Sequence, residues 1–443
     1  MESDHLQAKG IDKYIYVYIF LLLCWPKYAS LPGPIHISPF NIITIFALGY
    51  SAFKIFMKLA SGFFSQWSSA LIFIYVLEWA ARSASDLMGT SPSEAVYNTV
   101  RDYAWVGSPF AILVAADRIK FNLDRIAKLI LVLAMFIALT TAFEYMTQIS
   151  MANIIFKIFP LDSSSAYASM LLGDKSRDGA FRAQSFFTHP LVLGGVLSAF
   201  AAVAFSGIKQ EKRGWRLISA LTFILCVAAI PMTGTRSALV SVLVAIFANL
   251  TLNVLAIRRR DFRTVAIIVS FSIFLFGAFE IMSFANELKA GSTAAQAQSS
   301  TYREDMWAKG APAIAMSPVF GFGDGQSLRI AGVKVGDGLT VDDFYLTQLL
   351  DFGFLHELVA VIFFVFLTVS QFSKQSIINN RNYAIGMISG MVGILVSQKA
   401  TSIAESTEVF YLFAGILAGV LSPPSVVAGG AEVKLDDNGS TRP

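Results

Sequence analysis

A long polar stretch interrupts an otherwise apolar sequence, and it constrains the fold more than any other feature. Residues 284–341 are rich in glycine, alanine and charged side chains, whereas the sequence on both sides consists of successive apolar segments of about 20 residues. A lipid bilayer excludes irregular backbone from its hydrocarbon because unpaired peptide groups are costly there. The stretch therefore predicts a large loop on one membrane face, where chemistry can take place.

The apolar segments predict an all-α integral membrane protein. The 443 residues are 55% hydrophobic and 14% charged, with a mean hydropathy of +0.61, which is unlike soluble domains. The predicted transmembrane domain covers residues 1–421, with the large loop between spans 9 and 10, and residues 422–443 are predicted to be a disordered tail. About twelve spans are expected, centred near Phe20, Phe46, Ile74, Pro109, Met135, Ala199, Phe223, Val244, Phe274, Phe363, Gly393 and Gly415.

Basic residues gather in four short loops and set the predicted orientation. These loops lie near residues 118–128, 209–216, 258–263 and 374–381. Lys and Arg are enriched in cytoplasmic loops, so we expect these loops and both termini to be cytoplasmic. Loops 149–188 and 284–341 then face outward, into the periplasm if the cell is a Gram-negative bacterium. The net charge of +4 reflects this bias and gives no reason to expect a nucleic-acid partner.

No metal or cofactor is predicted from the sequence. Cys24 and Cys226 both lie within apolar segments and are expected to be packing residues. The four histidines lack the spacing of metal ligands. No glycine-rich phosphate loop follows a strand.

Two outward segments carry arginine beside a predicted span. Arg182 and His189 precede the helix that Pro190 is suited to begin, and Arg236 lies in a very short turn between apolar segments. A guanidinium near the hydrocarbon is costly and usually has a partner or a task. Anchoring to lipid headgroups is the alternative interpretation for both arginines.

The large loop carries a third arginine. Thr301 and Glu304 have the spacing of a capping box, which predicts a helix from there to about Ser317. Arg303 would then lie in the first turn, where the helix dipole disfavours a cation, and this suggests a nearby anion. Pairing with Glu304 or Asp305 is the structural alternative.

An acidic pair, Asp342 and Asp343, opens the next predicted span. One of the two can cap the helix while the other faces a cavity, although Asp342 as a simple N-cap is the alternative. The upstream glycines allow the backbone to approach a ligand closely; they are Gly321, Gly323, Gly325, Gly336 and Gly338. Glu78 and Arg82, one turn apart, are expected to form a structural pair. Three further charged residues are expected to line the same cavity, namely Lys399, Glu405 and Glu408.

Arginines and carboxylates on one face have a consistent chemical interpretation. Guanidinium binds phosphate bidentately and keeps its charge at any relevant pH. Arg182, Arg236 and Arg303 are therefore predicted to bind a diphosphate, while a carboxylate takes a proton from a hydroxyl nucleophile. Nucleotides are scarce outside the cytoplasm, so a polyprenyl carrier lipid is the expected source of the diphosphate.

The chain resembles the bacterial O-antigen ligase and Wzy-type polysaccharide polymerase superfamily. The similarity in the number of spans and in the placement of the loops extends over most of the chain. The shared motifs lie only between about residues 180 and 355. Their order and shared membrane side carry the resemblance; they are residues 182–190, 233–238, 302–307, 317–323, 342–346 and 351–353.

The resemblance implies a GT-C-like, inverting, metal-independent glycosyltransferase that depends on a lipid carrier. Such an enzyme takes a glycan from an undecaprenyl diphosphate donor and passes it to an acceptor hydroxyl. By analogy, Arg236 and Arg303, together with Arg182, would stabilise the departing diphosphate. Membrane lipid, a chain-length regulator and a flippase of the same pathway are the other partners implied.

One departure from the family pattern bears on the activity. Ligases of this superfamily usually present histidine, often followed by asparagine, where this sequence has Asp342 and Asp343. Histidine is the stronger base near neutral pH. The departure favours a polymerase of exopolysaccharide, capsule or O-antigen over a ligase that moves finished glycan to lipid A core or protein. His189 is an alternative base.

A lipid-linked oligosaccharide flippase or transporter is the non-enzymatic alternative. About twelve spans also suit transporters, but transporters place their charges near the bilayer midplane. Here the unusual charges lie at the outer rim, beside a loop larger than transport requires.

Overall fold

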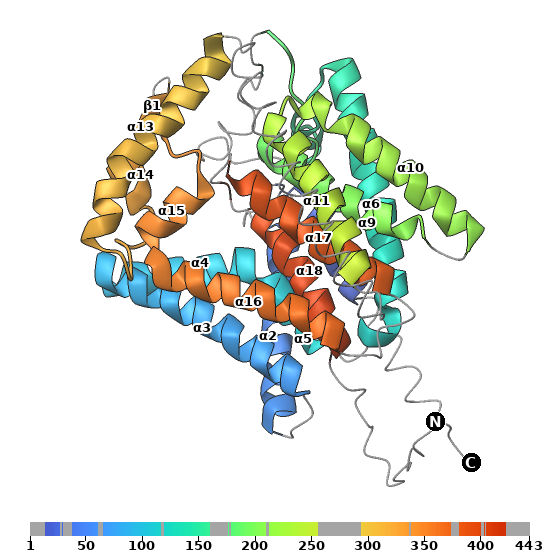
Figure 1. The fold of residues 1–443 in the computed structure, drawn as a ribbon, viewed down its shortest axis with the longest axis horizontal. Helices are drawn as coiled ribbons and strands as arrows, with labels where there is room; N and C mark the ends of the chain where they lie inside the picture. Colours follow the sequence, from blue (N-terminus) through green and yellow to red (C-terminus); the bar gives the residue numbers. More distant parts are fainter. Residues whose placement is uncertain are drawn as a thin grey trace.

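The described chain is almost entirely helical, as predicted (Figure 1). The computed structural model describes residues 14–26, 29, 38–60, 65–116, 119–159, 176, 179–209, 212–255, 294–335, 338–373, 381–399, 403 and 405–421. A helix covers every predicted span centre except Phe274, which lies outside these residues, as does the predicted tail 422–443.

The N-terminal half contributes the first group of helices. An apolar helix covers Tyr14–Cys24. It is followed by α2 (Pro39–Ala60), α3 (Gln66–Gly89), α4 (Pro92–Asp102), the π-helical turn η1 (Tyr103–Gly107), α5 (Ser108–Ala115), α6 (Ile119–Thr147), α7 (Met151–Phe156) and α9 (Pro190–Gly207). The π-helical turn directly precedes Pro109, which lacks the N–H that a regular α-helix requires.

The C-terminal half contains the remaining elements. They are α10 (Arg213–Ala229), the 3₁₀ turn η2 (Pro231–Thr233), α11 (Arg236–Leu255), α13 (Ala294–Met316), α14 (Gln326–Ala331), β1 (Val333–Val335), β2 (Gly338–Thr340), α15 (Phe344–Asp351), α16 (Gly353–Ser373), α17 (Arg381–Gln398) and α18 (Glu405–Leu421). The two strands pair antiparallel, with Val333 opposite Thr340, and they are an addition to the all-α prediction.

Six described helices are long and apolar enough to cross a membrane. They cover Pro39–Ala60, Leu123–Thr147, Pro190–Gly207, Arg213–Thr233, Arg236–Val254 and Gly353–Gln371. The protein is therefore a multi-pass membrane protein. Some of the other predicted spans are shorter helices, such as α5 with 8 residues and α18 with 17 residues.

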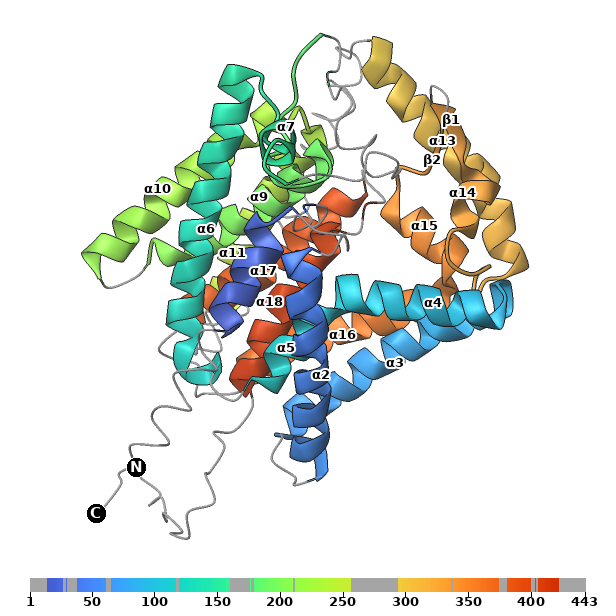
Figure 2. The same ribbon diagram turned by 180° about the vertical axis from the view of Figure 1, so that it is seen from behind.

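Helix α9 lies at the centre of the main bundle and packs against α17, α10 and α11 (Figures 1 and 2). Small residues on α9 and α17 let the two backbones approach closely, as is common in membrane bundles. A Cβ atom on Gly390 of α17 would lie 2.9 Å from the carbonyl oxygen of Ala199 on α9. The bundle core is therefore packed to the limit that glycine allows.

The large loop folds together with α15 into a separate outer layer made of α13, α14, the hairpin and α15. Its own apolar cluster contains Met306, Ala331, Val333, Val341, Leu346 and Leu350. The prediction that the acidic pair opens a span is wrong, because α15 is a short helix of this layer and the apolar helix that can cross a membrane begins at Gly353. Helix α13 ends at Met316, close to the predicted end, but it begins at Ala294 rather than at Thr301. The predicted capping box is therefore wrong, because the preceding segment is rich in Ala and Gln, which favour helix.

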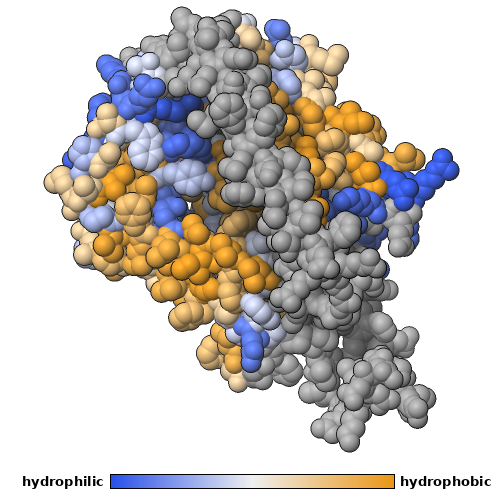
Figure 3. Space-filling model, viewed as in Figure 1, coloured by the Kyte–Doolittle hydropathy of each residue, from blue (hydrophilic) through white to orange (hydrophobic). Residues whose placement is uncertain are grey.

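The surface separates into an apolar and a polar part. Figure 3 shows apolar side chains gathered at the lower left, where α3 and α16 lie in Figure 1, while hydrophilic side chains cover the upper left around α13. The exposed apolar residues of these two helices include Phe73, Val76, Phe354, Leu358, Val361 and Val365. A contiguous apolar surface of this kind is expected where helices contact lipid.

Close packing between α18 and α5 gives a test of the fold. A Cβ atom on Gly415 would lie 2.9 Å from the Cα of Phe110, so Gly415→Ala must push the two helices apart. We expect a loss of about 1–3 kcal/mol, seen as a lower melting temperature of the protein in detergent. Gly214→Ala is the matched control, because its Cβ meets no atom within 4 Å. Equal melting temperatures for both variants would contradict this packing.

Candidate functional site

The predicted arginines Arg182 and Arg236 meet at one turn. The backbone N–H of Ala183 donates to the carbonyl of Met232 at 3.0 Å, and Nε of Arg182 donates to the carbonyl of Thr233 at 2.9 Å. Gly234 in this turn has a φ of +62°, a conformation that suits glycine. Arg236 begins α11 directly after the turn, and both arginines are half-buried. The pair therefore comes from segments about 50 residues apart.

The segment before α9 is fixed to the bundle by carboxylates. Glu144 on α6 accepts hydrogen bonds from the backbone N–H groups of Gln184 and Ser185. Glu405, at the start of α18, accepts from both the backbone and the hydroxyl of Thr188. Glu405, which was expected to line the cavity, therefore holds the segment before α9 against the start of α18.

His189 is the N-cap of α9. Its Nδ1 accepts a hydrogen bond from the backbone N–H of Leu191 at 3.1 Å. A ring nitrogen occupied in this way holds the helix start in place. The position therefore supports a structural role more strongly than the predicted role as a base.

A buried carboxylate connects the outer layer to the bundle. Asp343 has no exposed surface, and its Oδ2 accepts from Nε1 of Trp307 at 2.7 Å and pairs with Nζ of Lys399 at 2.6 Å. The Lys399 ammonium also lies 4.5 Å from the centre of the Trp307 ring. Asp343 is the N-cap of α15, because its Oδ1 accepts from the N–H of Leu346. One side chain thus joins α13, α15 and the end of α17.

The neighbouring Asp342 has a different environment. It is half-buried, and its Oδ1 accepts from the hydroxyl of Thr340 at 2.7 Å. The simple N-cap interpretation of Asp342 is wrong, since the cap is Asp343. The sequence argument that the two acids project differently is confirmed.

Arg303 lies one turn before Trp307 on α13, in the interior of the helix rather than in its first turn. The argument from the helix dipole therefore does not apply. However, its Nε is buried and has no hydrogen-bond acceptor among the described residues. An unsatisfied buried donor is costly, so Arg303 stays a candidate for a role in the site.

The two groups of charged residues lie at the same end of the bundle. A Cβ atom on Gly194 of α9 would contact Ala238 and Thr233 beside Arg236, and one on Gly195 would lie 2.4 Å from Oγ of Ser397. Ser397 is two residues before Lys399, the partner of Asp343. Close packing of α9 with α11 and α17 therefore brings the arginine turn and the acidic pair to one face.

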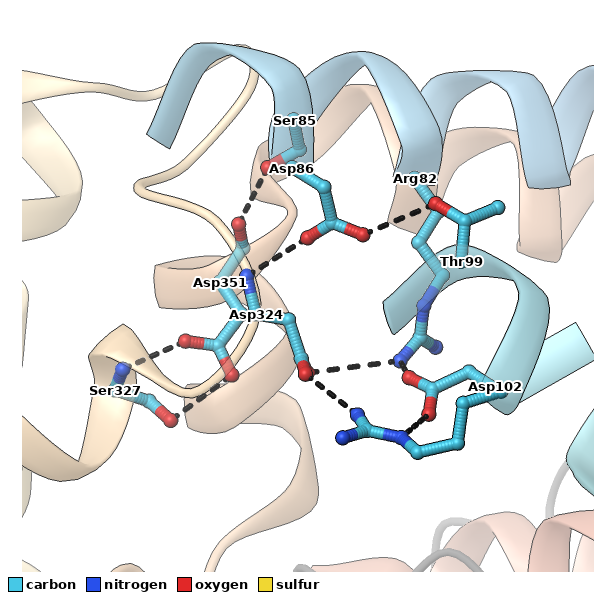
Figure 4. A network of polar contacts seen from close by, with 9 residues as sticks. Arg82, Ser85, Asp86, Thr99, Asp102, Asp324, Ser327 and Asp351 are labelled. Carbon is cyan, nitrogen blue, oxygen red and sulfur yellow. Dashed lines mark hydrogen bonds and ion pairs between the residues drawn. The ribbon is translucent and has the colours of Figure 1, made fainter. Parts of the chain in front are cut away.

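A polar network anchors the outer layer to α3 and α4 (Figure 4). Arg82 pairs with Asp102 and lies 3.8 Å from Asp324, while Asp324 donates its backbone N–H to Asp86 at 2.8 Å. Arg101 adds a 2.8 Å ion pair to Asp324. The contacts of Asp324 with Asp86 and Arg101 join residues more than 200 positions apart in the sequence.

The predicted pair of Glu78 and Arg82 is replaced by other partners. Arg82 binds the two aspartates of the network and stacks 4.0 Å from the centre of the Phe352 ring. Glu78 accepts from the Tyr411 hydroxyl instead. Although Glu78 and Arg82 lie one turn apart on α3, they do not pair with each other, because residues from other helices and loops interact with both side chains.

The glycines of the loop approach protein backbone. The N–H groups of Phe322 and Gly323 donate to the carbonyls of Leu350 and Asp351, both at 2.8 Å. A Cβ atom on Gly321 would lie 2.6 Å from the Asp351 carbonyl carbon. Gly321 and Gly323 therefore permit this close pairing of two motifs. Gly336 lies outside the described residues.

Sequence reasoning missed the roles of Asp86, Asp102 and Asp324. No local pattern marks them, because their partners are distant in sequence. Lys399 was expected near the cavity, and the structure gives it a partner, Asp343. Across the described ranges, no group of three or more His, Cys, Asp or Glu side chains is arranged to hold a metal ion.

The fold and the site define a multi-pass membrane protein with cationic and acidic groups gathered at one end of a helical bundle. Residues 221–355 match the family model described as O-antigen ligase. This match, over less than a third of the chain, confirms the predicted resemblance to the O-antigen ligase and Wzy-type superfamily. Members of this family are ligases or polymerases that act on lipid-linked oligosaccharide. No curated protein matches the chain.

The anchoring network predicts a pH dependence of stability. Burial raises the pKa of Asp351 to about 7, and the charge of Asp324 acts in the same direction. The folded state then holds a proton that the unfolded state has lost, so stability falls as pH rises from about 4 to about 7. Each unit of pKa difference corresponds to about 1.4 kcal/mol.

In Asp351→Asn this dependence should disappear, while the contact with Ser327 is retained. Melting temperatures of the two proteins in detergent between about pH 5 and pH 8 measure the difference. The exposed Asp305→Asn exchange should parallel the wild type. A wild-type profile parallel to that of Asp351→Asn would contradict the assignment.

Proposed function

We propose that the protein is a polysaccharide polymerase of the Wzy type. It joins undecaprenyl-diphosphate-linked oligosaccharide repeat units into exopolysaccharide, capsule or O-antigen at the periplasmic face of the inner membrane. The observation that carries the proposal is the gathering of Arg182, Arg236, Arg303 and the acidic pair at one end of the bundle. The family match to residues 221–355 supports the same class of reaction.

The arginines bind and stabilise the leaving group in this proposal. The acceptor hydroxyl attacks the anomeric carbon, and the electron pair of the breaking carbon–oxygen bond departs on the diphosphate. Arg236 and Arg303 bind that diphosphate and stabilise its growing charge. Arg182 is anchored to the turn that directly precedes Arg236.

Asp342 is better placed than Asp343 to accept the proton of the attacking hydroxyl group. Asp343 already accepts from Leu346, Trp307 and Lys399, which uses both of its oxygens. Of the two oxygens of Asp342, Oδ1 accepts a hydrogen bond from the hydroxyl of Thr340, and the side chain is partly open to solvent. It also occupies the position where ligases of the superfamily present histidine. We therefore assign Asp342 as the general base and Asp343 as the residue that positions Lys399 and Trp307.

A ligase is the second candidate function. The matching family model is described as O-antigen ligase, which favours transfer of a finished glycan to lipid A core or protein. The acid at the position of the ligase histidine favours the polymerase. The two activities leave different products in cells that lack the gene.

Carbohydrate analysis of a deletion strain tests the proposal. A polymerase deletion leaves single repeat units, whereas a ligase deletion leaves long polymer on its carrier lipid. Complementation with Arg236→Lys or Arg303→Lys should restore less than about a tenth of the polymer, because lysine keeps the charge but loses bidentate geometry. The matched control is the exposed Arg329→Lys. Polymer of normal length attached to its normal terminal acceptor in the deletion strain would overturn both candidate functions.

The two aspartates should respond differently to the same exchange. Asp342→Asn should lower transfer by about 100-fold or more with an unchanged melting temperature, because the base is lost from a partly exposed position. Asp343→Asn should lower the melting temperature, because the amide offers one acceptor oxygen to the three donors that Asp343 binds, Leu346, Trp307 and Lys399. Turnover of a lipid-linked acceptor and thermal unfolding in detergent measure the two effects. Equal and mild effects on both would refute the division of roles.

A further inference from the structure

The exposed surface of α13 changes character along the helix. Between Thr301 and Lys309 the exposed residues are mostly polar; they are Thr301, Glu304, Asp305, Ala308 and Lys309. From there to Val319 no exposed residue carries a polar side chain; these are Ala311, Pro312, Ala315, Met316, Pro318 and Val319. Scattered apolar residues are normal on a protein surface, whereas a contiguous apolar patch marks an interaction site. The two parts of α13 therefore face different surroundings.

The apolar end of α13 is bonded to the start of a helix that can cross the membrane. The backbone N–H groups of Phe354 and Leu355 donate to the carbonyls of Pro318 and Val319, at 2.8 Å and 3.1 Å. Helix α16 is apolar enough to span a bilayer from Gly353 onwards. These two bonds therefore place the turn after α13 at the level where the hydrocarbon begins.

Helix α3 carries its apolar surface to the same point. Figures 1 and 2 show the C-terminal end of α13 beside the end of α3 at which α4 begins. A Cβ atom on Gly89, the last residue of α3, would lie 1.8 Å from the carbonyl oxygen of Phe322. From Phe73 onwards no exposed residue of α3 has a polar side chain; these are Phe73, Val76, Leu77, Ala80, Leu87, Met88 and Gly89. The surface of α3 that is expected to contact lipid is thus continuous with the end of α13.

A groove of about 890 Å³ lies at this junction. Met88 of α3, Met316 of α13 and Val319 of the following turn line its apolar side, and they are 69%, 81% and 50% exposed. Gln326 and Arg329 line the side formed by α14. An apolar side next to a polar one is typical of a surface that lies at the boundary between lipid and water.

We propose that the end of α13 and the turn after it, residues 311–320, dip into the near leaflet of the bilayer, and that lipid chains fill the groove. The partner is the lipid surface, because these residues continue a surface that already faces lipid. Lys309 and Met316 are two helical turns apart, about 11 Å, which is close to the depth of about 5–10 Å to which interfacial helices bury their apolar side. The bilayer then holds the outer layer in addition to its contacts with the bundle.

Spin labels at two matched positions test the insertion. Ala308 and Ala315 are both exposed and lie seven positions apart, so they share one face of α13. Each is changed to cysteine in the full chain after Cys24→Ala and Cys226→Ala remove the two buried thiols. The labelled proteins are placed in nanodiscs of phosphatidylethanolamine and phosphatidylglycerol, and melting temperatures verify that both fold.

The readout is the relaxation of each label by two reagents. Oxygen concentrates in hydrocarbon, whereas a water-soluble nickel chelate stays outside it. We expect oxygen to relax the label of Ala315→Cys more strongly than nickel does. For Ala308→Cys we expect the reverse order, since this position lies in the polar part of the helix.

A further variant tests whether the apolar turn causes the insertion. Val319→Asp places a carboxylate where it is costly to enter the hydrocarbon. In the protein labelled at Ala315→Cys, this exchange should raise relaxation by nickel and lower relaxation by oxygen. Leu339→Asp is the matched control, because Leu339 is 54% exposed on the hairpin and does not line the groove. The control should leave the label unchanged.

The outcomes distinguish the lipid surface from other surroundings. Stronger relaxation by nickel at both labelled positions would show that the end of α13 lies in water and would overturn the proposal. Shielding of the Ala315→Cys label from both reagents would indicate a protein partner, such as a second copy of this chain, and would overturn it too. The same holds if Val319→Asp leaves the label unchanged. None of these readouts requires a glycan, so insertion without any transfer activity upholds the membrane contact and counts against the proposed polymerase alone.

Discussion

The arrangement of the site depends on the neutralisation of one buried charge. A carboxylate without solvent contact costs several kcal/mol unless a cation and hydrogen-bond donors compensate it. Asp343 meets this requirement only when Trp307 of α13, Lys399 after α17 and the first turn of α15 are all in place. The outer layer and the bundle therefore adopt their relative position together. Arg303, on the same face of α13 as Trp307, is placed as a consequence.

A second set of contacts supports this arrangement from the other side. The loop between α13 and α14 pairs with the junction of α15 and α16, and the aspartates of that region bind Arg82 and Arg101. Short helices such as α15, with 8 residues, have little stability of their own. Fixing both ends of α15, by Asp343 at the start and Asp351 at the end, gives it the rigidity that a positioned base requires.

The sequence allowed prediction of those features that depend on local pattern. Apolar periodicity located the helices, and the cost of charge near lipid selected Arg182 and Arg236. Arg303 was selected by an argument from the helix dipole that the earlier start of α13 removes. Features that depend on residues distant in the sequence could not be predicted. The N-cap could not be assigned between Asp342 and Asp343, because the choice depends on Trp307 and Lys399. Likewise, Arg82 prefers Asp102 to Glu78 for tertiary reasons, and the start of α13 followed the helix propensity of Ala and Gln rather than the capping box.

The enclosure of α9 has a consequence for biosynthesis. This helix is buried nearly all round, yet its main partner α17 begins about 190 residues later in the chain. Chains are translated from the N-terminus. The side of α9 that packs against α17 therefore finds its partner only after almost the whole polypeptide has been inserted into the membrane. Completion of the bundle is thus a late event, and premature termination before α17 would leave the face of α9 that packs against α17 without its partner.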